Sequence, residues 1–480
     1  MLARCWLAYF LTWNAHHEVK IMKLNTLRNI GFWIIGTYLV YLLITLVLLL
    51  IQGTGMTDMK EFFPFVAKQI LTNPIGWALL IAPYALFRLL KYLFLSWKNR
   101  SRLVFLKRFS FFIVLPVAFI FSGFNFSKWY TQSEKLEFSW DDSFNNNADT
   151  IQNRYALDGK QRGMHVFGRR AWDEEMVKAL MQTNMEWITL VPFGSQEDYD
   201  SESVGRRDTD YTTWTSRDSS FMNKTRDLKN CGFYIMIKPH IWMHNASSGK
   251  WRSDISPKTE EGWKKWSESY QRFIFHYARM SELLDVELFC VGTELHKTAI
   301  EHPDFWRQTI QEVRKIYSGK ITYAANWNEE LHDVTFWDQL DYIGIQAYYP
   351  LTNKTTPSVK ELKKGWKKHL DSIEKLQKEF NKPVLFSEIG YKSTDDAAIE
   401  PWAWANSFNG LYKKVSYQTQ ANCYEAFFQT FWDKEWFAGV HFWEWQSGRH
   451  RDDDKKNINF TPQQKPAENI MTKWFAKMGE

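Results

Sequence analysis

The sequence predicts an α/β protein, a (β/α)8 TIM barrel preceded by an N-terminal α-helical transmembrane region. Long apolar stretches occupy the N-terminal part of the chain. The rest alternates short apolar runs with segments of helical spacing, and there are eight such runs. An open sheet of eight parallel strands would need a reversal of strand order that nothing in the sequence marks, so we expect a closed barrel.

The expected strands read as continuously apolar, as parallel strands buried on both faces do. They are residues 164–166, 187–191, 234–237, 287–291, 321–324, 342–345, 384–386 and 439–442. Segments with helical spacing lie at 174–182, 259–284, 304–317, 359–380 and 422–437, with a last one near 467–477. Functional residues are expected at the carboxyl ends of the strands, because the βα loops of a barrel meet there.

The expected membrane region, residues 29–130, contains about three transmembrane helices. Residues 30–51 carry no charge, and the run is long enough to cross a bilayer, which takes about 20 residues. Further candidates are residues 75–95 and 109–126. A cleaved signal peptide would have a shorter apolar run and a small-residue cleavage site, so we favour membrane spans.

The positions of the basic residues predict the orientation in the membrane. Residues 88–108 hold seven basic side chains and no acidic one, and residues 1–28 form a basic N-terminal extension. The positive-inside rule places both segments in the cytoplasm and everything after Trp129 outside. In a bacterium this predicts a multi-pass protein of the plasma (inner) membrane, with an extracytoplasmic barrel and the lipid bilayer as a partner.

Charge also excludes one class of partner. The formal net charge is +6, but the basic segments around the membrane region account for more than that. The remainder is mildly acidic, at about −4, which argues against a nucleic-acid partner. Residues 131–160 are rich in Asn, Asp and Ser and are expected to form a flexible linker before the folded barrel, residues 161–480.

Two glutamates follow expected strands that lie across the barrel mouth from each other. Glu294 follows the fourth strand and Glu388 the seventh. A single glutamate in such a place is usually a solvated loop residue, but two can flank one glycosidic bond. One carboxyl group then protonates the leaving oxygen while the other attacks the anomeric carbon, at a separation of about 5 to 5.5 Å for retention. The pair therefore predicts a retaining glycoside hydrolase.

Four motifs carry a resemblance to a known family: Lys-Pro-His at 238–240, Gly-Thr-Glu at 292–294, Phe-Ser-Glu-Ile-Gly-Tyr at 386–391 and Phe-Trp-Glu-Trp at 442–445. Residues of about 160–478 resemble clan A glycoside hydrolases, and among them family 113, which contains endo-β-mannanases. The resemblance implies Glu294 as general acid/base, Glu388 as nucleophile, a β-1,4-mannan-type polysaccharide or oligosaccharide as substrate, and no cofactor. Most of clan A has Asn where Thr293 stands, which leaves the contact to the sugar 2-hydroxyl unassigned.

Other residues beyond the strands are expected to contact the sugar. The resemblance implies that Tyr348 donates a hydrogen bond to Glu388, with Tyr349 as a rival. Trp443 and Trp445 differ by two positions, so they should point the same way in an extended segment, and one could form the floor of a sugar subsite. Long loops at a barrel mouth are often functional, and residues 194–218 are expected to wall the substrate site. The remaining sugar-binding candidates, each with local packing as the alternative, are Lys238, His240, Trp242, Asn326 and Trp327.

Two alternatives remain to be weighed. His240, His244 and His296 suggest a metal site, but their spacing falls on a loop, no HExxH motif occurs, and the four cysteines form no CxxC pair. We therefore expect neither a metal nor a cofactor. The second alternative is a non-catalytic carbohydrate-binding or envelope-assembly protein that keeps the barrel shape, because a fold does not fix a function. The presence of both glutamates favours the enzyme.

Overall fold

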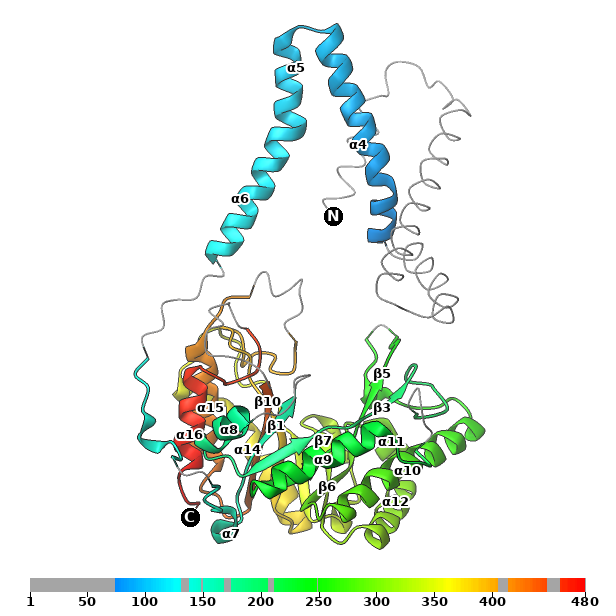
Figure 1. Cartoon of the computed structure of the whole chain (residues 1–480), viewed down its shortest axis with the longest axis vertical. Coiled ribbons are helices and arrows are strands. Elements are labelled where there is room, and N and C mark those ends of the chain that lie inside the picture. The colour runs from blue at the N-terminus through cyan, green and yellow to red at the C-terminus, as the bar shows by residue number, and fades with distance from the viewer. Residues whose placement is uncertain are drawn as a thin grey trace. The chain divides into compact units, whose positions relative to one another are not determined.

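The structure is a computed structural model that describes residues 74–130, 138–147, 150–167, 174–205, 211–247, 249–404, 413–446 and 458–479. The chain divides into two compact units, Met1–Asn125 and Phe126–Glu480. Figure 1 labels many of the elements of both units. The first expected membrane span, residues 30–51, lies outside the described residues.

The second unit contains a closed barrel of eight parallel strands in the described residues, in the order β1-β10-β9-β8-β7-β6-β4-β2. All eight expected strands are present, and the predicted TIM barrel is confirmed. The strands are β1 (Gln161–Phe167), β2 (Trp187–Leu190), β4 (Tyr234–Ile237), β6 (Leu288–Thr293), β7 (Lys320–Asn326), β8 (Tyr342–Gln346), β9 (Val384–Ile389) and β10 (Phe437–Gln446).

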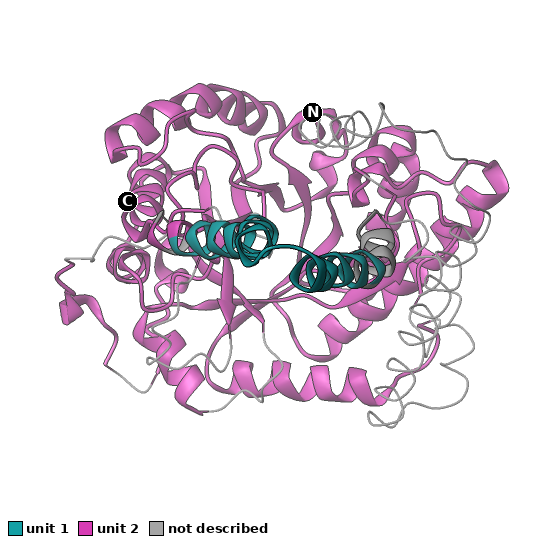
Figure 2. Cartoon of the chain, turned by 90° about the horizontal axis from the view of Figure 1, so that it is seen from above, with its two compact units in different colours: residues 1–125 teal, residues 126–480 magenta. Residues whose placement is uncertain are grey.

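Helices surround the strands, as Figure 2 shows for the second unit in magenta. The expected helix 359–380 is confirmed. A capping box between Ser358 and Glu361 starts this helix, and Asn381 ends it in the left-handed conformation. The expected helix 422–437 instead begins at Tyr417, since Ser416 caps its first turn. The helices are α8 (Glu174–Gln182), α9 (Ser216–Asn230), α10 (Glu260–Leu283), α11 (His296–Glu301), α12 (Pro303–Ile316), α13 (Glu329–Asp333), α14 (Val359–Phe380), α15 (Tyr417–Phe431) and α16 (Pro466–Phe475).

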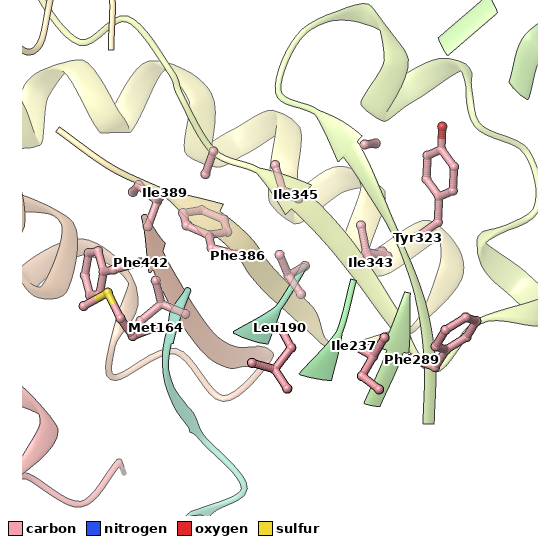
Figure 3. Close-up of a cluster of buried hydrophobic side chains, with 14 of the residues drawn as sticks. Met164, Leu190, Ile237, Phe289, Tyr323, Ile343, Ile345, Phe386, Ile389 and Phe442 are labelled. Atoms are coloured by element: carbon pink, nitrogen blue, oxygen red, sulfur yellow. The ribbon is translucent and has the colours of Figure 1, made fainter. Parts of the chain in front are cut away.

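Side chains alternate between two apolar cores along the strands. Leu288 lies in a small inner cluster with one residue from each of five other strands, whereas its neighbour Phe289 belongs to the large cluster that packs against the helices. Figure 3 shows members of the large cluster, including Phe289 and Phe386. Both faces of each strand are thus buried, which explains why the sequence of the strands is apolar without a period of two.

Part of the segment expected as a flexible linker packs against the barrel. Helix α7 (Tyr155–Asp158) precedes β1, and the Tyr155 ring lies edge-on to Trp187 and Tyr234 at the amino ends of β2 and β4. The Glu186 carboxylate accepts hydrogen bonds from the backbone N–H groups of Arg154 and Tyr155. These contacts place residues 154–158 at the end of the barrel opposite the carboxyl ends of the strands.

A second, two-stranded parallel sheet lies beyond the barrel strands and was not expected from the sequence. It pairs β3 (Phe193–Gln196) with β5 (His240–Met243). The sequence interpretation of residues 240–244 as a loop is therefore wrong for 240–243. The reason is that β5 follows β4 after two residues and pairs with β3 rather than with a barrel strand.

The described residues of the first unit form helices, and the last of these helices continues to Tyr130. Helix α4 (Pro74–Asn99) is followed by α5 (Arg102–Phe109), a π-helical turn η1 (Ser110–Val114) and α6 (Leu115–Tyr130). Among the described residues, length and composition would allow one helix, Arg102–Ser127, to cross a membrane, and it is not buried. The expected second span is helical within α4 but does not meet that criterion, so a multi-pass arrangement lacks support here.

Candidate active site

Both predicted catalytic glutamates lie at the carboxyl end of the barrel. Glu388 of β9 pairs with Gln346 in the last residue pair between β9 and β8, and Glu294 directly follows β6. Their side chains are almost buried, since Glu294 is 8% and Glu388 is 6% exposed. Burial, followed by the negative charges of Glu388 and then Glu294, raises the pKa of Tyr348 well above its usual range. The structure thus brings both carboxyl groups into the surroundings of one phenol.

Three donors hold the Glu388 carboxylate. Lys238 Nζ donates to Oε2 over 2.6 Å and Gln346 Nε2 donates to the same oxygen over 3.0 Å. Tyr348 Oη donates to Oε1 over 2.6 Å, so the expected hydrogen bond between Tyr348 and Glu388 is present. Donors of this kind, one of them charged, stabilise a carboxylate anion. The rival Tyr349 instead packs against Trp366 and His369.

Lys238 differs from its expected role. Its side chain is buried, and Nζ also donates to Gln346 Oε1 and to the Ser387 carbonyl oxygen, both over 3.2 Å. An ammonium group has three N–H donors. The bonds to Glu388, Gln346 and Ser387 use all three. The expected hydrogen bond from Lys238 to a sugar is therefore corrected to an ion pair with Glu388.

His165 on β1 completes the surroundings of Glu388 and was not singled out in the sequence. Its Nε2 atom lies 3.7 Å from Glu388 Oε2, and its Nδ1 atom lies 3.1 Å from the Phe442 carbonyl oxygen. Burial, and then the positive charge of Lys238, lower the pKa of His165 well below its usual range. His165 is therefore neutral, and Nδ1–H donates to the carbonyl oxygen.

Backbone and side-chain contacts fix Glu294. Its φ of 55° lies in the left-handed region, and its N–H donates to the Ala324 carbonyl oxygen over 2.9 Å. The next N–H, of Leu295, donates to Tyr323 Oη over 3.0 Å. Trp251 Nε1 donates to Glu294 Oε2 over 2.9 Å, and Arg252 Nε lies 3.5 Å from the same oxygen. Neither Trp251 nor Arg252 was predicted from the sequence.

A third acidic side chain, Glu330 on α13, lies behind Glu294. It is buried, and its carboxyl group accepts hydrogen bonds from Tyr323 Oη over 2.6 Å and from the Asn326 N–H over 3.0 Å. Burial outweighs these bonds and, with the charge of nearby Glu294, raises the pKa of Glu330 to about 7. Tyr323 thereby connects Glu330 to the backbone that follows Glu294.

A fourth acidic side chain, Glu444 on β10, lies near Glu388. It is almost buried, and its carboxylate accepts a hydrogen bond from Gln446 Nε2 over 2.8 Å. Burial, together with the charge of Glu388 and against the bond from Gln446, raises the pKa of Glu444. The sequence contained Glu444 within a motif, yet its position between two tryptophans gave no sign of its carboxyl group facing the site.

The two tryptophans of β10 do not point the same way, which corrects the sequence expectation. Trp443 packs with Tyr348 and Phe460 beside Glu388, whereas Trp445 belongs to the large core. The pairing of β10 with β1 shifts here, because Phe442 pairs with Met164 but Trp445 pairs with Val166. Three residues of one strand thus match two of the other, and the simple alternation is lost.

The other predicted sugar-binding residues have mixed surroundings. His240 is buried, with Nδ1 2.7 Å from Arg252 NH1, and a contact of its other ring nitrogen with a sugar remains a prediction. Trp242 is 49% exposed on β5. Asn326 is partly buried and ends β7, and Trp327 stacks on Trp402 with ring centroids 5.4 Å apart.

The long loop that was expected to wall the site packs partly elsewhere. Tyr211 lies against Phe273 of α10, and Trp214 lies against His276 of the same helix. The Tyr199 ring, in contrast, lies under Lys250 Nζ. Lys250 directly precedes Trp251, which contacts Glu294. The role of loop 194–218 as a wall of the substrate site remains a prediction.

Two of the three histidines considered for a metal site have side-chain partners in the protein. His240 contacts Arg252, and His296 Nε2 lies 2.9 Å from Asp333 Oδ2. Among the residues that the structure describes, no group of three or more His, Cys, Asp or Glu side chains could hold a metal ion.

The chain is similar to known glycoside hydrolases. The family model Glycoside Hydrolase Family 113 matches residues 161–465. A structure of a GH113 β-1,4-mannanase complex is 26% identical and covers 66% of this chain and 98% of its own, with a TM-score of 0.56. The GH113 β-mannanase AaManA from Alicyclobacillus acidocaldarius, in complex with ManMIm, is 28% identical over 66% of this chain and 97% of its own, with a TM-score of 0.56.

A further structure of a GH113 β-1,4-mannanase is 27% identical over 65% of this chain and 97% of its own, with a TM-score of 0.54. No curated protein matches the chain in a sequence search. The family match covers more than half of the chain and contains both glutamates. This chain, a β-mannanase-like glycosidase, belongs to glycoside hydrolase family 113.

Proposed function

We propose that the chain hydrolyses β-1,4-linked mannan or manno-oligosaccharides with retention of configuration. The observation that carries this proposal is the pairing of Glu388, held by Lys238 and Tyr348, with Glu294 at the same end of the barrel. The solved family 113 structures that resemble the chain are described as β-mannanases, which supports mannan as the substrate class. No cofactor is needed for this chemistry.

In the first step, Glu388 is the nucleophile. Its carboxylate attacks the anomeric carbon while the bond to the leaving oxygen breaks, and Glu294 gives its proton to that oxygen. The products are a glycosyl ester of Glu388, a free alcohol and the Glu294 carboxylate. Lys238, Gln346 and Tyr348 keep the attacking carboxylate in one orientation before the ester forms.

In the second step, the roles of Glu294 reverse. Its carboxylate removes a proton from a water molecule, whose oxygen attacks the anomeric carbon and releases Glu388. Two inversions at the same carbon leave the β-configuration unchanged. Trp443, Trp242, Asn326 and Trp327 are the side chains that we propose to contact the sugars, and Trp443 lies in one apolar cluster with Tyr348.

The stereochemistry of the first product tests this proposal. Proton NMR during hydrolysis of mannohexaose by the full-length chain in detergent should show the β-anomer first, followed by slow mutarotation. Cello- and xylo-oligosaccharides of equal length serve as controls and should be cleaved much more slowly. Release of the α-anomer would contradict the double displacement, and binding of manno-oligosaccharides without hydrolysis would favour a carbohydrate-binding protein instead.

We also propose that residues 29–130 anchor the barrel to the outer side of the plasma (inner) membrane, with residues 131–160 as the connection. The support is the apolar, unburied helix Arg102–Ser127 and the basic side chains at its start. The full chain should stay in the membrane pellet after alkaline extraction. Replacing exposed Phe119 and Ile120 together by Arg should move a substantial share into the supernatant. Complete release of the unchanged chain would contradict an anchor.

A further inference from the structure

Two donors from one loop face a single oxygen of Glu294. Trp251 Nε1 donates to Oε2 over 2.9 Å, and Arg252 Nε lies 3.5 Å from the same oxygen. An indole N–H and a guanidinium group donate hydrogen bonds and cannot accept them. A proton on Oε2 would therefore face the indole hydrogen of Trp251 and a nearby guanidinium cation, whereas a proton on Oε1 would not.

We propose that Trp251 is a positioning residue that keeps the acidic proton of Glu294 on Oε1 and so directs it to the leaving oxygen. This inference rests on the proposed role of Glu294 as general acid/base. When Glu294 gives up its proton, negative charge develops on the carboxyl group, and the bond from Trp251 becomes charge-assisted. An interaction that strengthens as the leaving bond breaks accelerates that step.

The loop around Trp251 is built to hold this geometry. The Trp251 backbone N–H donates to Asp254 Oδ2 over 3.0 Å, and Lys250 Nζ donates to Asp254 Oδ1 over 2.9 Å. Burial acts to raise the pKa of Asp254, but the bonds from Lys250 and Trp251 hold it below its usual value. Asp254 is thus the ionised anchor of the loop and ends the short 3-10 turn η3 (Arg252–Asp254).

Arg252 is fixed from the other side by His240. Burial, then the charges of Arg252 and Lys238, lower the pKa of His240 well below its usual range. The neutral ring accepts a hydrogen bond at Nδ1 from Arg252 NH1 over 2.7 Å. The guanidinium group also lies over the Trp251 ring, 4.5 Å from its centroid. The ring and the guanidinium group therefore support each other next to Glu294.

The exposure of Trp251 makes the inference testable. The side chain is 44% exposed, so its replacement by Phe retains most of the ring surface over Arg252 and removes the N–H donor. Substrates differ in their need for the acid. The alcohol that leaves a manno-oligosaccharide must be protonated, whereas 2,4-dinitrophenolate leaves without a proton.

The experiment measures kcat/KM of the full-length chain in detergent on a manno-oligosaccharide and on 2,4-dinitrophenyl β-mannoside. For Trp251→Phe we expect about a tenfold loss on the oligosaccharide, the worth of one hydrogen bond to a charged group, and less than about a twofold change on the aryl glycoside. Glu294→Ala should show the same selectivity with a larger loss. Trp140→Phe is the matched control, because Trp140 is 45% exposed in a segment before the barrel and should leave both values unchanged.

The outcomes separate this inference from the proposed function. Equal losses on both substrates in Trp251→Phe, or no loss on either, would overturn the role of Trp251 while the proposed function stands. A wild-type chain that is inactive on both substrates would overturn the proposed function and the inference together. Unfolding temperatures of Trp251→Phe and Trp140→Phe, compared with wild type, show whether any loss comes from misfolding.

Discussion

Replacement of Glu388 by Gln is expected to lower kcat on manno-oligosaccharides by about 10⁴-fold or more. Gln has nearly the same shape, and its amide oxygen can still accept a bond from Lys238 or Tyr348. It cannot form the glycosyl ester, because a neutral amide is a very poor nucleophile at the anomeric carbon. Release of reducing ends from mannohexaose by the purified full-length chain measures the loss.

The same substitution should also lower stability, and this must be measured alongside activity. Lys238 is buried, and Glu388 is the anion that contacts its ammonium group. Removing one charge of a buried ion pair costs about 3 to 5 kcal/mol. Thermal unfolding followed by tryptophan fluorescence should therefore show a lower midpoint, with a cooperative transition retained. Glu379→Gln, in an exposed part of α14, is the control that should change neither quantity.

Azide distinguishes loss of the nucleophile from loss of folding. In Glu388→Ala the side chain that attacks from below the ring is gone, and azide can enter the vacated space and attack the same face. Turnover of 2,4-dinitrophenyl β-mannoside should recover, with an α-mannosyl azide as product. Wild-type-like turnover in Glu388→Gln without azide would exclude Glu388 as the nucleophile.

The barrel was predictable because each strand is buried on both faces. Leu385 and Phe386 illustrate this, since one side chain lies in the inner cluster and the next in the outer one. A run of that kind is apolar at every position, and eight such runs separated by helical segments allow few arrangements. The small sheet of β3 and β5 escaped prediction because it depends on pairing between two loop segments, which no local pattern announces.

A residue of the site was predictable only where its position along a strand determines that it lies at the carboxyl end of the barrel. Glu294, Glu388 and Tyr348 each stand at or just beyond a strand end, and the bond between Tyr348 and Glu388 is present. Lys238 is also at a strand end, but which acceptor its ammonium reaches depends on side-chain packing. Trp251 is 43 residues from Glu294 in sequence, and a hydrogen bond between a loop and a distant strand end leaves no periodic signal.

The pairing of β10 explains why Trp443 and Trp445 were misread. A period of two along a strand assumes that its register with both neighbours is constant. Here the register shifts against β1 and also against β9, between Val440 and Phe442. Such irregularities are common next to active sites, where they redirect a side chain. In this chain the redirected part of the strand carries Trp443 and Glu444, and both lie near Glu388.

Glu330→Gln is expected to change how the stability of the barrel depends on pH. The pKa of Glu330 is raised from an ordinary 4.5 to about 7 in the folded chain. Between these two values the unfolded chain has lost the proton that the folded chain still holds. The stability that this shift contributes is complete below about pH 4.5 and is lost as the pH rises through about 7.

The expected size follows from the shift. Between pH 5 and pH 8 the wild-type chain should lose roughly 2 kcal/mol in free energy of unfolding relative to Glu330→Gln, because each pKa unit corresponds to about 1.4 kcal/mol. Gln has nearly the shape of the protonated form, and its amide oxygen can accept from Tyr323 Oη as the carboxyl group does. Any loss of the bond from the Asn326 N–H is then the same at every pH and does not change the pH dependence. Denaturant unfolding of the full-length chain in detergent at several pH values measures the difference.

The neighbouring residue provides a matched control. Glu329 is exposed in the same helix, so Glu329→Gln should follow the wild-type pH curve. Parallel curves for wild type and Glu330→Gln would mean that Glu330 is ionised when folded across this range. If the wild-type chain instead loses stability relative to Glu330→Gln as the pH rises, a neutral carboxyl group lies behind Glu294 below about pH 7. Above that pH, a second negative charge lies there. Any pH dependence of catalysis near neutrality must then be measured in Glu330→Gln before it is attributed to Glu294.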